Sequence, residues 1–219
     1  QSVHVLNMSS LDYLIRALCQ NFTFESEDEN DIDAFMWDLL AFVCVKNAEH
    51  ATDSTERISV VLDHVRKLMD KSTNHDYMLI HCYKMVLRLA LVLIEANKSI
   101  KVCVDMITAI LKRIKDSTVA IPEVSYALLA DLFAKSGTLD SELINSVFTC
   151  LLQSRQQMPI NPSYFTLLNI LVSQELFATQ PLHLSIVVSC ISNYGVQVTD
   201  GDKEVISKIP KLIEEIHRW

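Results

Sequence analysis

Three side chains that can carry positive charge, His81, Lys84 and Arg88, follow one another within an otherwise apolar stretch. On a helix, residues spaced at i, i+3 and i+7 project in one line. Such a line can receive an acidic or phosphorylated peptide through charge-assisted hydrogen bonds. A buried helix with a single edge in solvent shows the same pattern, and this is the more common cause. A binding role for this line is therefore a hypothesis.

Two further residues are weaker candidates for contact with a partner. Asn169 lies at the centre of a second line with the same spacing, formed with Thr166 and Ser173. A row of amides and hydroxyls can hold the backbone of an extended peptide. Trp37 lies in an apolar pattern typical of a core residue, although tryptophan is also enriched at interface hot spots.

The residue types that enzymes and metal sites need are present but are not grouped. The six cysteines are never closer than 21 residues, and the seven histidines form no zinc-ligand spacing. Three glycines are too few for phosphate loops or a nucleophile elbow. We therefore predict no catalytic, cofactor-binding or metal-binding residue, and we interpret the cysteines as reduced thiols in a core. An enzyme-regulating domain with a site assembled from distant residues is an alternative.

The net charge of -8 arises mostly in one segment, residues 23–33. We predict that residues 23–31 form a solvated loop between two helices. An EF-hand is excluded, because the turn glycine and the late bidentate glutamate are missing. Ser26 is followed by Glu27, Asp28 and Glu29, an environment that acidophilic kinases prefer, so Ser26 is a candidate for phosphorylation.

Nucleic acid and membranes are disfavoured as partners. The cations between residues 98 and 115 have no interleaved aromatic residues, so a solvated helix surface explains them better than contact with nucleic acid. The most apolar run, residues 85–94, is interrupted by Arg88 and is too short to cross a bilayer. We expect a protein partner.

Start and stop signals predict helices along the chain, and no segment has the alternation of a strand. Ser9 or Ser10 is expected to cap the first helix, and Ser99 the fifth. Asp53 with Glu56 resembles a capping box at the start of the third. The second to seventh helices are expected at about 32–46, 53–70, 75–96, 99–115, 122–136 and 139–155, and the last three from about 161, 180 and 202.

The third predicted helix has the clearest division into two faces. Its apolar positions recur at helical spacing, whereas its charged positions fall between them. The residues expected inside are Ile58, Val61, Leu62, Val65, Leu68 and Met69. Those expected in solvent are Asp63, Arg66, Lys67 and Asp70.

Pairing consecutive helices gives units that start near residues 9, 53, 99, 139 and 180. The dipeptide Ser-Tyr at 125–126 recurs at 163–164. Paired helices at this spacing resemble HEAT and armadillo repeats, and the layout also resembles that of MIF4G-type domains. The resemblance is architectural and implies stacked hairpins. In armadillo-like repeats the second helix of a hairpin lines the inner surface, which would place the cationic line there.

Together these patterns predict an all-α protein, an α-α superhelix (solenoid) of about five hairpins and about ten helices. Residues 1–219 are expected to be a single domain from a longer intracellular protein, nuclear or cytoplasmic. The expected function is a non-catalytic scaffold that binds a peptide or helix of a protein partner. The alternatives are a MIF4G-like adaptor that contacts RNA or RNA-bound proteins, and the enzyme-regulating domain.

Overall fold

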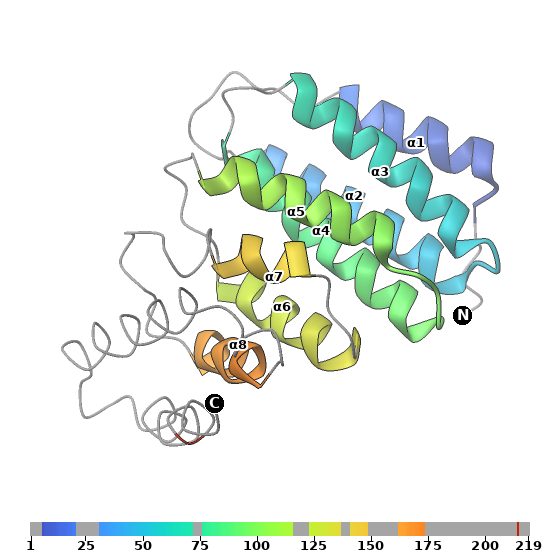
Figure 1. The fold of residues 1–219 in the computed structure, drawn as a ribbon. Coiled ribbons are helices and arrows are strands. Elements are labelled where there is room, and N and C mark those ends of the chain that lie inside the picture. The colour runs from blue at the N-terminus through green and yellow to red at the C-terminus, as the bar shows by residue number, and fades with distance from the viewer. Residues whose placement is uncertain are drawn as a thin grey trace. The chain divides into compact units, whose positions relative to one another are not determined.

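A computed structural model of the chain describes residues 6–20, 31–71, 76–115, 123–136, 141–148, 162–173 and 214. Every regular element in these segments is a helix, which confirms the all-α prediction. The chain divides into two compact units, Gln1–Val119 and Ala120–Trp219 (Figure 1). Ser26, most of the acidic segment and the predicted helices from 180 onward lie outside the described residues.

Five described helices form the first unit, at boundaries close to those predicted from the sequence. The predicted starts of the second to fifth helices differ from the observed starts by at most two residues. The helices are α1 (Met8–Gln20), α2 (Asp31–His50), α3 (Ser54–Lys71), α4 (Asp76–Glu95) and α5 (Lys101–Lys115).

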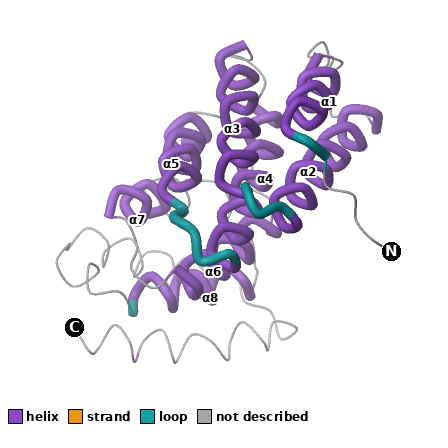
Figure 2. The backbone as a smooth tube through the Cα atoms, turned by 90° about the vertical axis from the view of Figure 1, so that its right-hand side faces the viewer, coloured by secondary structure: helices purple, strands orange, loops and turns teal. Residues whose placement is uncertain are grey.

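The helices of the first unit form two layers. One layer contains α1, α3 and α5 side by side, and the other contains α2 and α4 (Figure 2). Helix α3 packs against α1 and α5 in its own layer and against α2 and α4 in the other. Helix α4 packs against α2, α3 and α5.

Burial in the first unit follows the predicted helix faces. All six apolar positions expected inside α3 are buried, and its four charged positions are exposed. Helix α4 is apolar almost all round, and most of its residues from Met78 to Leu93 are buried. A helix with this composition forms part of a core, because it can remove most of its surface from water.

The start of α1 differs from the prediction. The cap is Asn7 rather than Ser9 or Ser10, since the Asn7 side-chain Oδ1 accepts a hydrogen bond from the backbone N–H of Ser10 at 2.8 Å. Asn is as good a cap as Ser, and the third helical N–H is the usual donor to such a cap. Both serines therefore lie within the first turn.

In the second unit the described helices are α6 (Glu123–Ser136), α7 (Ser141–Val147) and α8 (Pro162–Val172). Pro162 occupies the first position of α8, as predicted from its fixed φ and missing N–H. Helix α6 packs against α8. The two tyrosines of the recurring Ser-Tyr pair meet in this contact, where Tyr126 and Tyr164 pack edge to face with ring centroids 5.4 Å apart.

Candidate functional site

The predicted cationic line lies on α4, on the edge of this helix that is least buried. Its neighbours in sequence are buried, whereas His81 and Lys84 are half-buried and Arg88 is exposed. Access to solvent therefore increases along the line from His81 to Arg88.

The structure brings two of the predicted site residues together. The rings of Trp37 on α2 and His81 on α4 stack with centroids 5.5 Å apart and an interplanar angle of 10°. Trp37 is only 2% exposed, so the indole belongs to the core. Its contact fixes the orientation of the imidazole at the inner end of the line.

Lys84 and Arg88 form no ion pair or hydrogen bond with the part of the chain that the structure describes. Other arginines of the first unit have such partners, for example Arg57 with Asp53 and Arg66 with Asp63. An arginine head group that has no carboxylate of its own keeps its five donors available to a ligand. The outer half of the cationic line can therefore receive an anionic group.

Asn169 lies on α8 and is half-buried. Its Oδ1 atom is buried and has no hydrogen-bond donor among the described residues. Ser173, at the end of the same line, donates its hydroxyl to the carbonyl of Ile170. Because α4 and α8 belong to different units, we treat Asn169 and the cationic line as separate features.

An apolar stripe on α2 is a feature that the sequence patterns do not assign to a face. Trp37, Leu40 and Cys44 are buried on one side of this helix, whereas Phe42 is 62% exposed on the other. Leu39 and Val43 beside it are half-buried. A helix that packs on one side needs only one apolar face. The sequence of α2 is apolar on two sides, and this excess of apolar residues is the signal that indicates an exposed apolar surface.

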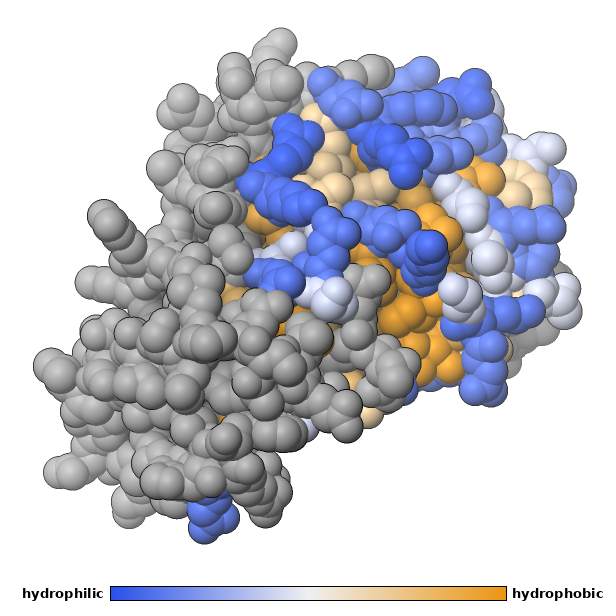
Figure 3. Space-filling view, in the orientation of Figure 1, coloured by the Kyte–Doolittle hydropathy of each residue, from blue (hydrophilic) through white to orange (hydrophobic). Residues whose placement is uncertain are grey.

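On the face drawn in Figure 3, hydrophilic side chains gather over α1 and α3, with apolar surface visible between hydrophilic groups. Isolated exposed apolar residues are common, so Phe42 gains significance from its two half-buried neighbours rather than from its exposure alone.

One cation of the basic region around α5 stabilises the fold. Arg113 donates from Nη1 to the backbone carbonyl of Met69 in the last turn of α3, at 2.7 Å. This bond satisfies a carbonyl that lacks a partner within its own helix. Arg113 therefore serves the packing of α5 on α3, which weakens the case for this region as a surface that contacts RNA.

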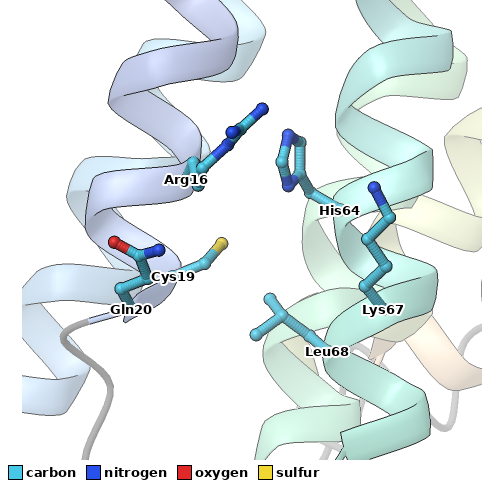
Figure 4. Close-up of a pocket in the computed structure, with 6 residues that line it drawn as sticks. All are labelled: Arg16, Cys19, Gln20, His64, Lys67 and Leu68. Carbon is cyan, nitrogen blue, oxygen red and sulfur yellow. The ribbon is translucent and has the colours of Figure 1, made fainter.

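A pocket with a volume of about 250 Å³ lies between α1 and α3. Figure 4 shows the lining side chains, with those of α1 on one side of this space and those of α3 on the other. Cys19 directs its sulfur toward this space, although we expected every cysteine to be fully buried. The lining residues are Arg16, Cys19 and Gln20 from α1, and His64, Lys67 and Leu68 from α3.

Asp12 holds two of these side chains in place. One carboxylate oxygen contacts Arg16 Nη2 at 2.7 Å, and the other contacts His64 Nε2 at 2.8 Å. The hydrogen bond from His64, assisted by the charge of Arg16, lowers the pKa of the Asp12 carboxyl below its usual value. The carboxylate is therefore ionised, and it bridges α1 to α3 beside the pocket.

The sequence patterns missed this pocket because its members lie on two helices. On α1, Asp12, Arg16 and Cys19 have the spacing i, i+4, i+7, and on α3, His64, Lys67 and Leu68 have the spacing i, i+3, i+4. Each set is a recognisable line on its own helix. Nothing in either line indicates that the two lines face each other.

The described part of the chain contains neither a cluster of metal-ligand side chains nor a membrane-spanning helix. Within it, no three histidine, cysteine or acidic side chains are grouped closely enough to hold a metal ion. Nor does any described helix have the length and apolar character that crossing a membrane requires.

Comparisons with protein-family models, curated protein sequences and solved structures gave no match to this chain. The function must therefore be argued from the residues and their geometry.

Proposed function

We propose that this chain is a protein-interaction scaffold whose α4 edge binds an acidic or phosphorylated segment of a protein partner. The observation that carries the proposal is the pair Lys84 and Arg88, which have no acidic partner among the described residues, on a helix that is otherwise buried. Charge-assisted hydrogen bonds to carboxylate or phosphate oxygens are the interactions that such groups form most strongly.

The contact of His81 with Trp37 supports this role. A stacked imidazole at the inner end of the line presents its ring edge in a fixed orientation, so less conformational entropy is lost when a ligand binds there.

The architecture we propose is an α-α superhelix built from stacked hairpins. Within the first unit, α1 packs against α3, α2 against α4, and α3 against α5, so each helix contacts the helix two positions further along. Stacked helical hairpins produce this pattern, because neighbouring repeats bury their faces against each other. Such scaffolds usually bind partners on an extended surface rather than in an enclosed catalytic site.

The test is the binding of immobilised peptides rich in aspartate, glutamate and phosphoserine. We expect the chain to retain these peptides more strongly than neutral peptides of the same length. The variant Lys84→Glu/Arg88→Glu should bind at least about tenfold more weakly, because each charged hydrogen bond contributes about 1.5–3 kcal/mol.

A matched control is the variant Lys98→Glu/Lys101→Glu. Its two lysines are exposed, lie at the turn from α4 to α5, and change the net charge by the same amount. Tryptophan fluorescence and helical circular dichroism would show that each variant keeps its fold. The proposal fails if acidic peptides are not retained, or if the two double variants weaken binding equally.

A further inference from the structure

The pocket between α1 and α3 places a thiol among cationic side chains. Cys19 is half-buried and directs its sulfur into the space between the helices, where Arg16 and Lys67 also lie (Figure 4). Nearby cations favour the thiolate over the thiol, and the thiolate is the nucleophilic form of cysteine. Partial exposure in a cationic environment is the setting in which cysteines react.

His64 adds a further polar group to the same pocket. Its side chain is only 10% exposed, and its Nε2 contacts the ionised Asp12 carboxylate. Because a carboxylate only accepts hydrogen bonds, the Nε2–H of His64 donates to Asp12. Nδ1 has no hydrogen-bond partner among the described residues, so this ring nitrogen can form a hydrogen bond with a polar group of a ligand.

The other described cysteines lack these properties. Cys44, Cys82 and Cys103 are buried, and burial raises the pKa of each thiol, to about 12 for Cys82 and Cys103. The adjacent Cys19 raises the pKa of Cys44 and of Cys82 further. These three thiols stay protonated and out of reach of a reagent in solution.

We propose that Cys19 forms a reversible mixed disulfide with a small anionic disulfide of the glutathione class. The carboxylates of such a ligand suit Lys67, which has no ion pair with a described residue, and the donors of Arg16 that Asp12 leaves unused. Its amide groups, which can both donate and accept hydrogen bonds, suit the Nδ1 atom of His64. The pocket, with a volume of about 250 Å³, offers space for part of the ligand beside the Cys19 sulfur.

The reaction is a thiol–disulfide exchange. The Cys19 thiol first releases its proton to water. The thiolate sulfur then attacks one sulfur of oxidised glutathione, so that a bond forms between Cys19 and that sulfur while the glutathione S–S bond breaks. The second glutathione leaves as a thiolate and takes up a proton. Cys19 is oxidised, and the departing glutathione is reduced.

The first experiment incubates the full chain with oxidised glutathione under native conditions and locates the adduct by peptide mass mapping. We expect an adduct of one glutathione on the peptide that contains Cys19, reversed by a reducing agent. Cys44, Cys82 and Cys103 should remain unmodified. If Cys19 reacts no faster than these buried thiols, the proposal is wrong.

The second experiment separates recognition of an anion from simple exposure of the sulfur. The rate of modification at Cys19 is measured with a dianionic aromatic disulfide, 5,5′-dithiobis(2-nitrobenzoate), and with neutral 4,4′-dithiodipyridine. The Lys67→Gln variant should slow the anionic reagent by about fivefold and the neutral reagent much less, because one favourable charge is removed.

Lys98→Gln is the matched control, since Lys98 is an exposed lysine at the end of α4 and does not line the pocket. Equal effects of the two variants on the anionic reagent would overturn the proposal. Peptide-level rates report on Cys19 directly, so other thiols do not disturb the result. These experiments concern α1 and α3 and do not depend on peptide binding at α4.

Discussion

Asp12 connects α1 to α3 through two charged neighbours, one on each of its carboxylate oxygens. The contact with Arg16 lies within one helix and is visible in the sequence as an i, i+4 pair. The contact with His64 spans 52 residues and depends on how the helices pack. At the residue scale, the contact of Asp12 with Arg16 was therefore predictable from sequence spacing, whereas the contact of Asp12 with His64 was not.

The Asp12→Asn variant tests the contribution of this bridge to stability. The pKa of Asp12 is lowered in the folded state, so its contribution is fully present above the usual value of 3.8 and is lost as the pH falls through the lower folded-state value. We expect the variant to have a smaller free energy of unfolding than the wild type at pH 7. This difference should shrink below about pH 4.

Urea unfolding at several pH values measures this effect. Asp63→Asn is the control, because Asp63 contacts Arg66 at 3.4 Å with both side chains more than 60% exposed. An exposed pair of this kind contributes about 0–1 kcal/mol. A constant difference for Asp12→Asn from pH 7 to pH 3 would contradict the assignment of the effect to its charge.

At the scale of the element, α4 ends in a motif that its sequence only partly indicates. Asn97 has φ of 52°, in the left-handed region, and its N–H donates to the carbonyl of Ile94. The next residue, Lys98, donates to the carbonyl of Leu93. This pair of bonds is a Schellman motif with Asn in the position where Gly is most common.

Substitutions at Asn97 can therefore separate the effect of the side chain on stability from the effect of the backbone conformation. Asn97→Ala should lower the free energy of unfolding by about 1 kcal/mol, because Cβ disfavours positive φ and alanine lacks the polar side chain that helps asparagine there. Asn97→Gly should cost less than Asn97→Ala, since glycine adopts positive φ without this penalty. Chemical denaturation measures both variants, and equal losses would show that backbone conformation is not the cause.

Helix faces were predictable where apolar residues recur on one side. The division of α3 into a buried and an exposed face follows from its spacing, and the structure confirms it. Helix α2 is apolar on two sides, so its spacing did not show that Trp37 is inside and Phe42 outside. The packing of α2 against α3 and α4 decides which of its two apolar sides is buried.

At the scale of the whole molecule, the chain forms two compact units that meet in sequence between Val119 and Ala120. The sequence predicted a single domain of regular repeats and did not indicate this division. The first unit has its own core, formed where α4 packs against α2, α3 and α5.

We expect residues 1–119 to fold without the rest of the chain. The fragment should have a helical circular dichroism spectrum and a single cooperative urea transition, with a slope of about 1–2 kcal/mol/M for a chain of this size. A broad, non-cooperative transition would mean that the first unit needs the second for its core. The full chain, measured in parallel, is the reference.

The sequence by itself determined the all-helical class, most described helix boundaries and the buried face of α3. These features depend on neighbours within a few turns, so composition, caps and spacing specify them. Tertiary structure decided the stacking of Trp37 on His81, the bond from Arg113 to Met69, and the pocket that unites Cys19 with His64. In each case the partners lie on different helices and more than 40 residues apart, so their meeting depends on which helix faces pack together.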